Sequence, residues 1–266
     1  EAYGVDSSKL DIVIMQMVRL VRDGETIKLS KRSGKAITLN TLLDEIPIDA
    51  ARFFFKCLTT PDGAIGYRYF KNRGLTDDTI KRFGLGFAPD SFNALTDYML
   101  GKGYTKDELV FANLARRSTK NSNNIYDNFR NRVMFPIIDV KGNVIAFGGR
   151  VMDDSKPKYL NTSDTLVYKK SMGVFALNLA KKSGKDSLIL CEGYMDVIAL
   201  HQAGFTNAVA GLGTALTSEQ AQLLSRYASE ILISYDADEA GQKATRRAMD
   251  IFSKEDVSVK VLQMEG

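Results

Sequence analysis

Short apolar runs alternate with amphipathic segments over the last third of the chain. The runs have the length and composition of buried strands and lie at residues 187–193, 207–213, 230–238 and 257–264. The segments between them have apolar residues at helical spacing and lie at residues 194–204, 217–228 and 239–254. Four strands alternating with three helices predict right-handed crossovers and a parallel, Rossmann-like sheet.

The middle of the chain follows a different pattern. Residues 57–115 carry apolar positions at helical spacing, and Thr76, which two acids follow, is a good start for a helix. Residues 132–140 and 144–151 alternate as strands do and flank a Lys-Gly-Asn turn, which predicts a hairpin. The expected fold class is therefore α/β, with a mixed α+β subdomain before the parallel sheet.

The first residues predict an extra strand, loop and helix segment. Residues 12–21 are apolar and β-rich, and the Asp-Gly pair after them predicts a turn. A basic loop rich in serine and glycine follows at residues 26–35, and loops of this kind often bind the phosphates of ATP. Helical spacing covers residues 38–55, where Pro47 is expected to separate two helices.

Composition excludes several classes of protein. The chain has 266 residues, 44% of them hydrophobic, and a net charge of +4, which predicts a globular protein and is too mild to indicate nucleic acid by itself. Two distant cysteines and the single His201 give no zinc site or disulfide framework, which favours a reducing cytoplasm. No apolar run approaches the roughly 20 residues of a membrane span. The first residue is Glu, which suggests a fragment.

Acidic side chains follow two strands of the predicted sheet. Glu192 ends the first strand, and Asp236 and Asp238 end the third. Ligands of such sheets bind at the carboxyl ends of the strands, and the spacing of two residues directs both aspartates to one side if the backbone stays extended. Crowded carboxylates repel one another unless a cation neutralises them, so a hard divalent ion, Mg²⁺ or Mn²⁺, is implied.

A structural alternative stays open for these acids. Acidic residues are favoured at helix N-termini, and Glu192 and Asp238 each precede a predicted helix. That role needs no metal ion. It explains each residue singly, but it explains the set of three in this topology less well.

The sequence around these acids resembles a known family. The segments "CEGYMDVIALHQAGF", "AGLGTALT" and "SYDADEAGQKATRRA" are similar to the Toprim catalytic fold, in the version found in bacterial DNA primases. Two earlier segments, "NRGLTDDTIKRFGLGFAPDSF" and "FRNRVMFPIIDVKGNVIAFGGRVMDDSKPKYLN", are similar to the basic subdomain of the primase core. The resemblance runs from about residue 50 to the end.

This resemblance implies a function, partners and site residues. A primase makes RNA primers on a single-stranded DNA template from nucleoside triphosphates, and its replicative helicase binds a further C-terminal domain. Glu192, Asp236 and Asp238 match the catalytic acids that hold Mg²⁺ or Mn²⁺. The expected nucleotide- and DNA-binding residues are Arg82, Arg130, Arg132, Arg150, Lys158, Tyr159, Asn161 and Lys170. Arginine suits phosphate, and Tyr159 suits base stacking. The Gly148-Gly149 pair is expected to let the backbone approach a ligand.

The sequence also departs from the family pattern. The resemblance implies an Asp-Pro-Asp motif after the fourth strand and a zinc-binding domain before the core, and neither is found between Glu1 and Gly266. The second metal position is therefore expected to be incomplete in this chain.

The first 56 residues resemble another family. Residues 15–55 are similar to the region around the mobile ATP loop of class I aminoacyl-tRNA synthetases, most closely arginyl-tRNA synthetase. The resemblance places Lys28, Ser30 and Lys31 in a displaced ATP loop. The domains expected are a synthetase-like and possibly chimeric segment at residues 1–56, a basic subdomain at residues 57–180 and a Toprim domain at residues 181–266.

Three hypotheses follow for the function. The first is a primase core, an enzyme that polymerises RNA on DNA. The second is a synthetase-related ATP-binding enzyme, which predicts an arginine-dependent ATP–pyrophosphate exchange that needs Lys31. The third is an inactive fragment that binds nucleic acid.

Overall fold

The computed structural model describes residues 20–22, 25–27, 39–213 and 215–262, with side chains from residue 45 onward. The chain divides into two compact units, residues 1–36 and 37–266. In the first unit, β1 (Leu20–Arg22) pairs antiparallel with β2 (Glu25–Ile27). Most of the strand predicted at residues 12–21, and the predicted ATP-loop residues Lys28, Ser30 and Lys31, lie outside the described residues.

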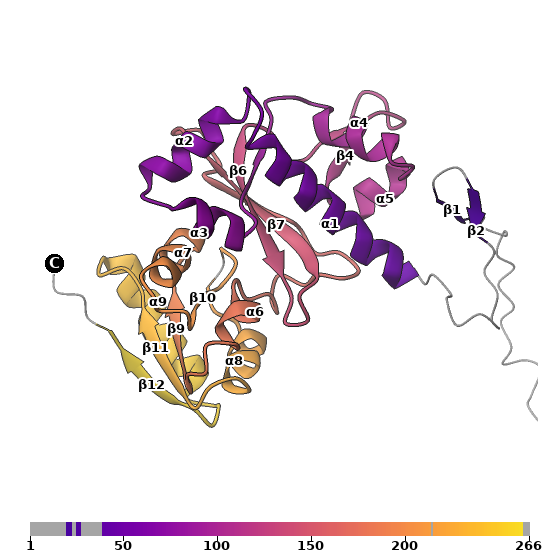
Figure 1. The fold of residues 1–266 in the computed structure, drawn as a ribbon. Coiled ribbons are helices and arrows are strands. Elements are labelled where there is room, and N and C mark those ends of the chain that lie inside the picture. Colours follow the sequence, from indigo (N-terminus) through magenta and orange to yellow (C-terminus); the bar gives the residue numbers. More distant parts are fainter. Residues whose placement is uncertain (1–19, 23–24, 28–38, 214, 263–266) are drawn as a thin grey trace, which may run out of the picture. The chain divides into compact units, whose positions relative to one another are not determined.

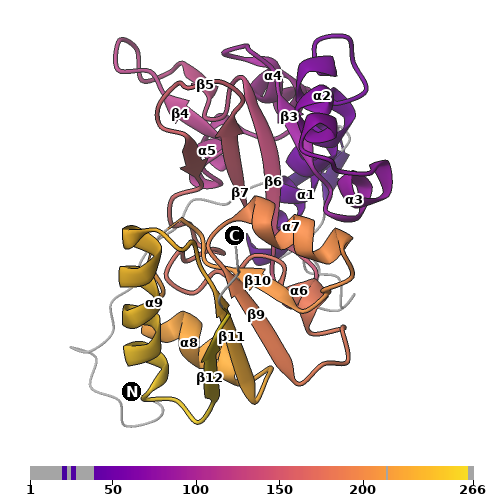
Figure 2. The same ribbon diagram turned by 90° about the vertical axis from the view of Figure 1, so that its left-hand side faces the viewer.

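A four-stranded parallel sheet forms the C-terminal part of the second unit. Its strands are β9 (Ser187–Cys191), β10 (Ala208–Ala210), β11 (Glu230–Ser234) and β12 (Ser258–Val261). They lie side by side in the order β10-β9-β11-β12. The connecting helices are α7 (Tyr194–Gln202), α8 (Ser218–Ser225) and α9 (Glu239–Phe252) (Figure 2). The predicted strands, helices and parallel topology are confirmed.

Side chains of β9 alternate between two cores, as the period of two in a strand requires. Leu188 and Leu190 pack with α8 and α9 in one cluster, whereas Ile189 and Cys191 pack with α7 in another. Both faces of the parallel sheet are therefore covered. This explains why its strands are apolar runs instead of alternating ones.

An antiparallel sheet forms the centre of the preceding region. Its strands lie in the order β3-β6-β7-β8, and β6 (Arg132–Ile138) and β7 (Val144–Val151) are the predicted hairpin. The outer strands are β3 (Gly86–Ala88) and β8 (Tyr159–Asn161). A separate two-stranded sheet joins β4 (Ala115–Arg117) to β5 (Ile125–Asp127).

Helices surround the antiparallel sheet. They are α2 (Ala64–Asn72), α3 (Asp77–Arg82), α4 (Ala94–Gly101) and α5 (Lys106–Phe111), and the short α6 (Leu177–Ala180) leads to the parallel sheet. Thr76 caps α3 by accepting a hydrogen bond from the backbone N–H of Thr79, as predicted. No helix in the described part of the chain is both long enough and apolar enough to cross a bilayer.

The helical prediction for residues 57–115 is wrong at β3. Gly84 has a φ of +60°, which ends the preceding helical turn. At Gly86 an added Cβ would come within 2.6 Å of the Phe54 Cβ, so glycine lets this strand lie directly under α1. The strand forms because its backbone pairs with β6. The local sequence pattern contains no information about this distant partner.

The predicted break at Pro47 is also wrong, because α1 is one helix from Leu39 to Cys57. Ile46, Ala50 and Phe54 are spaced four residues apart and are buried on one face, against β3 and β7. This packing on both sides of Pro47 holds the helix together despite the missing backbone N–H. The predicted domain boundary after residue 56 therefore falls in a helix of the second unit's core (Figure 1).

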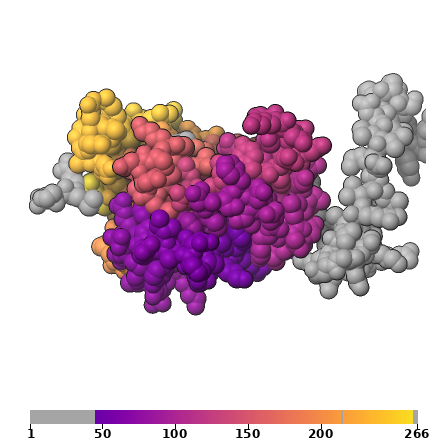
Figure 3. Space-filling model, turned by 90° about the horizontal axis from the view of Figure 1, so that it is seen from above, coloured from indigo at the N-terminus to yellow at the C-terminus, as the bar shows by residue number. Residues whose placement is uncertain are grey.

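One hydrophobic cluster joins the two sheets. Phe135 of β6 stacks on Tyr194 of α7 with ring centroids 5.0 Å apart, and Phe175 meets the same tyrosine edge-on at 4.8 Å. Phe83, after α3, stacks on Phe175 at 5.9 Å. In Figure 3 the indigo to magenta part of this unit accordingly passes without a break into the orange to yellow part.

Phe54→Ala should lower the free energy of unfolding by about 3–5 kcal/mol, because it opens a cavity between α1 and the antiparallel sheet. Phe55→Ala is the matched control, since the neighbouring ring is 37% exposed. It should cost about 1 kcal/mol or less. Urea unfolding of the full chain, followed by circular dichroism, measures both. Equal small losses would contradict the place of α1 in the core.

Candidate active site

A cavity of about 770 Å³ lies at the carboxyl ends of β9 and β11. The strand order changes direction here, because β9 leads to β10 on one side and has β11 on the other. Open α/β sheets bind ligands at such a point. Glu192 directly follows β9, Asp236 lies two residues after β11, and both line the cavity, as the sequence predicts.

The acids of the cavity disturb one another electrostatically. Burial raises the pKa of Glu192, and the charges of Asp236, Asp238 and Asp196 add to this shift. The backbone N–H of Asp236 lies 3.5 Å from Oε2 of Glu192, and this contact partly offsets the rise in the pKa of Glu192. Glu192 is exposed and lines the cavity, so it is accessible to a ligand there.

Asp196 is a fourth acid that the sequence reasoning missed. It lines the cavity from the first turn of α7, and its Oδ2 accepts a hydrogen bond of 3.0 Å from the backbone N–H of Gly193. Burial, followed by the charge of Asp236, raises the pKa of Asp196. The sequence does contain a signal for Asp196 as an acid of the site. It lies four residues after Glu192, in the first turn of the helix predicted after that strand.

Asp238 does not line the cavity and caps α9 instead. Its Oδ1 accepts a hydrogen bond of 2.7 Å from the backbone N–H of Gly241, which is the structural alternative left open by the sequence. Gly241 is required there, because an added Cβ would come within 2.0 Å of the Asp236 carbonyl oxygen. In the described part of the chain, no three metal-ligating side chains are already placed to enclose an ion. Two of the three predicted acids, Glu192 and Asp236, therefore line the cavity.

Basic and aromatic side chains line the same cavity. Lys158, Tyr159 and Arg150 all face it, as predicted. The Arg150 side chain donates to the carbonyl of Val151 at 3.0 Å, and its guanidinium lies 5.1 Å from the Tyr69 ring and 5.8 Å from the Tyr159 ring. Arg150 is only 9% exposed, yet among the described residues no carboxylate pairs with it. A buried cation without a carboxylate is costly unless a ligand supplies the anion.

Two of the predicted binding residues make hydrogen bonds within the protein. Arg132 is 8% exposed, and its guanidinium donates to the carbonyls of Gly149 and Lys158 at 3.3 and 3.4 Å, so it joins β6 to the strands beside it. Asn161 lines the cavity, but its Oδ1 accepts from Tyr194 and its Nδ2 donates to the Leu212 carbonyl, both at 2.9 Å. Both side chains make hydrogen bonds within the protein, and the expectation that they contact nucleotide or DNA stays a prediction.

Three other predicted residues lie away from the cavity lining. Arg82 is exposed on α3, and Lys170 donates its backbone N–H to Asp164. Arg130 packs on Phe92 and Tyr126, with its guanidinium 4.6 and 5.4 Å from the two ring centroids. None of the three is among the residues that line the cavity of the acids.

Tyr194 connects the acidic and the basic sides of the cavity. Burial raises the pKa of Tyr194, and its hydroxyl donates a hydrogen bond to Oδ1 of Asn161 on β8. The expectation for Gly148 changes as a result. An added Cβ there would come within 2.7 Å of the Tyr194 ring, so this glycine makes room for a protein side chain and not for a ligand.

Arg73 also lines the cavity, and the sequence reasoning missed it. It directly follows α2, and its guanidinium lies 5.6 Å from the Tyr69 ring. No local pattern distinguishes this arginine from the other exposed basic residues, because only the tertiary structure brings α2 to the cavity.

Comparison with known families gives two matches that together cover most of the chain. Residues 53–181 match the N-terminal domain of the DNA primase catalytic core, and residues 189–266 match a Toprim-like domain. The matches meet between residues 181 and 189, close to the division predicted after residue 180.

Known proteins and structures agree with these matches. The DNA primase of Clostridium acetobutylicum is 50% identical over 255 residues, which cover 94% of this chain and 42% of that protein. A DNA primase domain from Pseudomonas aeruginosa superposes with a TM-score of 0.78 at 38% identity, over 84% of this chain and 71% of that one. A DnaG primase catalytic domain bound to single-stranded DNA gives a TM-score of 0.77 at 33% identity, over 85% and 71%. The chain thus spans about two fifths of the length of its curated relatives.

The comparisons do not support a synthetase segment at residues 1–56. Those residues are 56 of 266, or 21% of the chain, whereas the match to the Clostridium primase leaves out only 6%. Most of the segment must therefore align with a primase. By its sequence matches and by the superposition of its fold on solved primase structures, the chain belongs to the DNA primase family.

Proposed function

We propose that this chain synthesises short RNA primers on single-stranded DNA by metal-dependent nucleotidyl transfer. The observation that carries the proposal is the cavity itself. It joins Glu192, Asp196 and Asp236 to cations that no carboxylate neutralises in the described part of the chain. Acids suit a divalent cation, and unpaired cations suit phosphate, so the two together suit a metal-bound nucleotide.

The acids fit a hard divalent ion by their chemistry. All are oxygen donors. Burial, together with the charges of neighbouring acids, raises the pKa values of Glu192 and Asp196, and a bound cation would favour their charged forms. Glu192 and Asp236 would hold Mg²⁺ or Mn²⁺, and Asp238 would join through the oxygen that does not cap α9. When bound, such an ion polarises phosphate and lowers the pKa of a coordinated hydroxyl.

The basic side chains would bind and orient the triphosphate. Arg150 is held rigidly by two tyrosine rings and a carbonyl, so it loses little freedom on binding. Lys158 adds a mobile point charge from the exposed end of its segment. Tyr159 offers a half-buried ring beside them, which suits stacking with a base.

The template would follow the basic surface outside the cavity. Arg130 with Phe92 and Tyr126 forms a cation and aromatic cluster, and Phe92 is 64% exposed. Such clusters bind single strands by stacking and by charge. Arg82 and Lys170 are further candidates. The helicase partner and the cytoplasmic location expected from the resemblance stay predictions.

Primer synthesis tests this function. The full chain should incorporate ribonucleotides on single-stranded DNA with Mg²⁺ or Mn²⁺. Glu192→Gln or Asp236→Asn should each lower the rate about a hundredfold or more, because several kcal/mol of metal-dependent stabilisation is lost. Glu239→Gln is the control, since Glu239 is exposed and pairs with Lys243. Undiminished synthesis by both cavity variants would refute the assignment.

Thermal unfolding tests the acid cluster without catalysis. The raised pKa of Glu192 means that ionisation is less favourable in the folded chain than in the unfolded one, so its charge costs stability at pH 7. Glu192→Gln should therefore raise Tm in EDTA by on the order of 1–2 °C.

Mg²⁺ should raise the Tm of the wild-type chain and change that of the Glu192→Gln variant much less. Glu239→Gln again serves as the control and should keep the full response to Mg²⁺. A Mg²⁺ response that is equal in wild type and in the Glu192 variant would show that Glu192 does not hold the ion.

A further inference from the structure

We propose that a pocket between α1, α2 and α3 binds an acidic peptide segment of a partner protein. The segment places one large apolar side chain in the pocket and a carboxylate beside Lys81. The pocket has a volume of about 410 Å³. Among the described residues none lines both this pocket and the cavity of the acids, so the proposal goes beyond the proposed function and does not depend on it.

Apolar side chains form most of the pocket wall. Phe55 of α1 and Tyr67 of α2 line it, and each is 37% exposed. Leu58 and Ile80 are buried and complete the apolar part of the wall. Single exposed apolar side chains are common on protein surfaces, but these two rings line one concave site together with buried apolar residues. Such a site suits a large apolar side chain, which it would remove from water.

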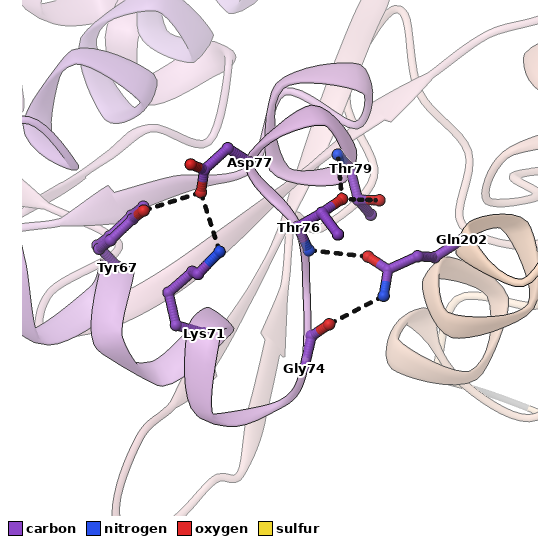
Figure 4. A network of polar contacts seen from close by, with 7 residues as sticks. All are labelled: Tyr67, Lys71, Gly74, Thr76, Asp77, Thr79 and Gln202. Atoms are coloured by element: carbon purple, nitrogen blue, oxygen red, sulfur yellow. Dashed lines mark hydrogen bonds and ion pairs between the residues drawn. The ribbon is translucent and has the colours of Figure 1, made fainter.

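Hydrogen bonds fix the walls of this pocket. Oδ1 of Asp77, the first residue of α3, accepts a hydrogen bond of 2.8 Å from the Tyr67 hydroxyl and one of 3.1 Å from Nζ of Lys71 (Figure 4). These two contacts join α2 to α3. After the end of α1, the hydroxyl of Thr59 donates to the carbonyl of Lys56 at 2.8 Å, which fixes the turn there. A pocket with fixed walls loses little conformational entropy when a ligand binds.

A residue of the parallel-sheet part also holds α3 in place. Gln202, the last residue of α7, accepts a hydrogen bond from the backbone N–H of Thr76 at 2.8 Å and donates one to the carbonyl of Gly74 at 2.9 Å (Figure 4). Thr76 is the residue that caps α3. The helix that forms one wall of the pocket is therefore fixed at its N-terminus by a side chain 126 residues away in the sequence. The pocket is thus formed before a ligand binds.

Lys81 gives the pocket an uncompensated positive charge. The charged residues that line the pocket are Asp77 and Lys81, and the ion pair with Lys71 already neutralises Asp77. Asp78, the next residue on α3, does not line the pocket. Lys81 is exposed, and among the described residues its side chain makes no hydrogen bond or ion pair. A carboxylate is therefore the complementary group for a ligand to present.

A nucleic-acid strand fits this pocket less well than an acidic peptide does. A strand presents a phosphate at every nucleotide and is bound by a groove with many cations. The pocket offers one unpaired lysine together with the carboxylate of Asp77. One anchoring side chain with a charge beside it is instead typical of contacts between proteins, where a few residues that fill pockets contribute most of the affinity.

Fluorescence anisotropy with a synthetic peptide tests the proposal. The probe is a fluorescein-labelled peptide in which one phenylalanine stands between two runs of aspartate. The full wild-type chain should bind it with a Kd on the order of 10–100 μM. A peptide with alanine in place of the phenylalanine, and one with lysines in place of the aspartates, should each bind about tenfold more weakly or worse, because each lacks one of the two recognised groups.

Two variants test whether the peptide binds in this pocket. Phe55→Ala should weaken peptide binding about tenfold, because part of the apolar wall is lost. Lys81→Glu should also weaken it about tenfold, because the reversed charge replaces attraction with repulsion. Lys56→Ala is the matched control, since Lys56 is exposed and adjacent to Phe55 but does not line the pocket, and it should bind the peptide as the wild type does. Urea unfolding checks that each variant is folded.

Other outcomes would overturn the proposal. These are no peptide binding by the wild type, equal binding of the aspartate and lysine peptides, or unchanged binding by both folded pocket variants. If the two variants lose binding of an oligo(dT) single strand as strongly as they lose the peptide, the pocket belongs to the template. If sedimentation velocity finds a wild-type dimer that Phe55→Ala dissociates, a second copy of the chain occupies the pocket. Primer synthesis by the wild type tests the proposed function separately from all of these.

Discussion

The stack of Tyr194 on Phe135 sets how the two sheets of the larger unit meet. The rings are nearly parallel, with an interplanar angle of 9°, and Tyr194 is only 3% exposed. Its hydroxyl continues the contact to Asn161 on β8. Because Tyr194 comes two residues after Glu192, the ring that joins the sheets also places the acidic loop beside the basic strands. The site is thus a consequence of a hydrophobic interface.

The cavity brings acidic and basic side chains together, and none of them takes part in an ion pair among the described residues. Elsewhere, basic residues such as Lys102 and Lys260 pair with Asp49 and Glu230. In the cavity, burial and the charges of neighbouring acids raise the pKa of Glu192, and two guanidiniums lie near one tyrosine ring. Such an arrangement lowers the free energy of unfolding. The chain still folds because the surrounding hydrophobic core contributes more stability than these charges cost. Its benefit comes when a ligand carries the missing charges.

Local patterns were reliable where a segment's own residues decide its structure. The strands and helices after residue 186 have uninterrupted apolar runs, clear periods and capping residues such as Thr217, and all of them formed. The pattern predicted the wrong secondary structure where contacts with another segment of the chain decide it. Pro47 remains inside a helix because residues on both sides of it are buried, and Gly86 joins a strand because β6 lies beside it.

The sequence by itself determined the fold class, the hairpin, the parallel sheet and the placing of Glu192 and Asp236, because alternating strands and helices predict parallel strands whose carboxyl ends lie at one edge of the sheet. Through the family resemblance it also indicated Arg150, Lys158 and Tyr159, which line the cavity and whose binding of nucleotide stays a prediction. Only the tertiary structure decided that Asp238 caps a helix, that Arg132 and Asn161 make hydrogen bonds within the protein, and that Arg73 reaches the cavity. These roles depend on distances between segments far apart in the chain, and such distances arise only when the two sheets pack together.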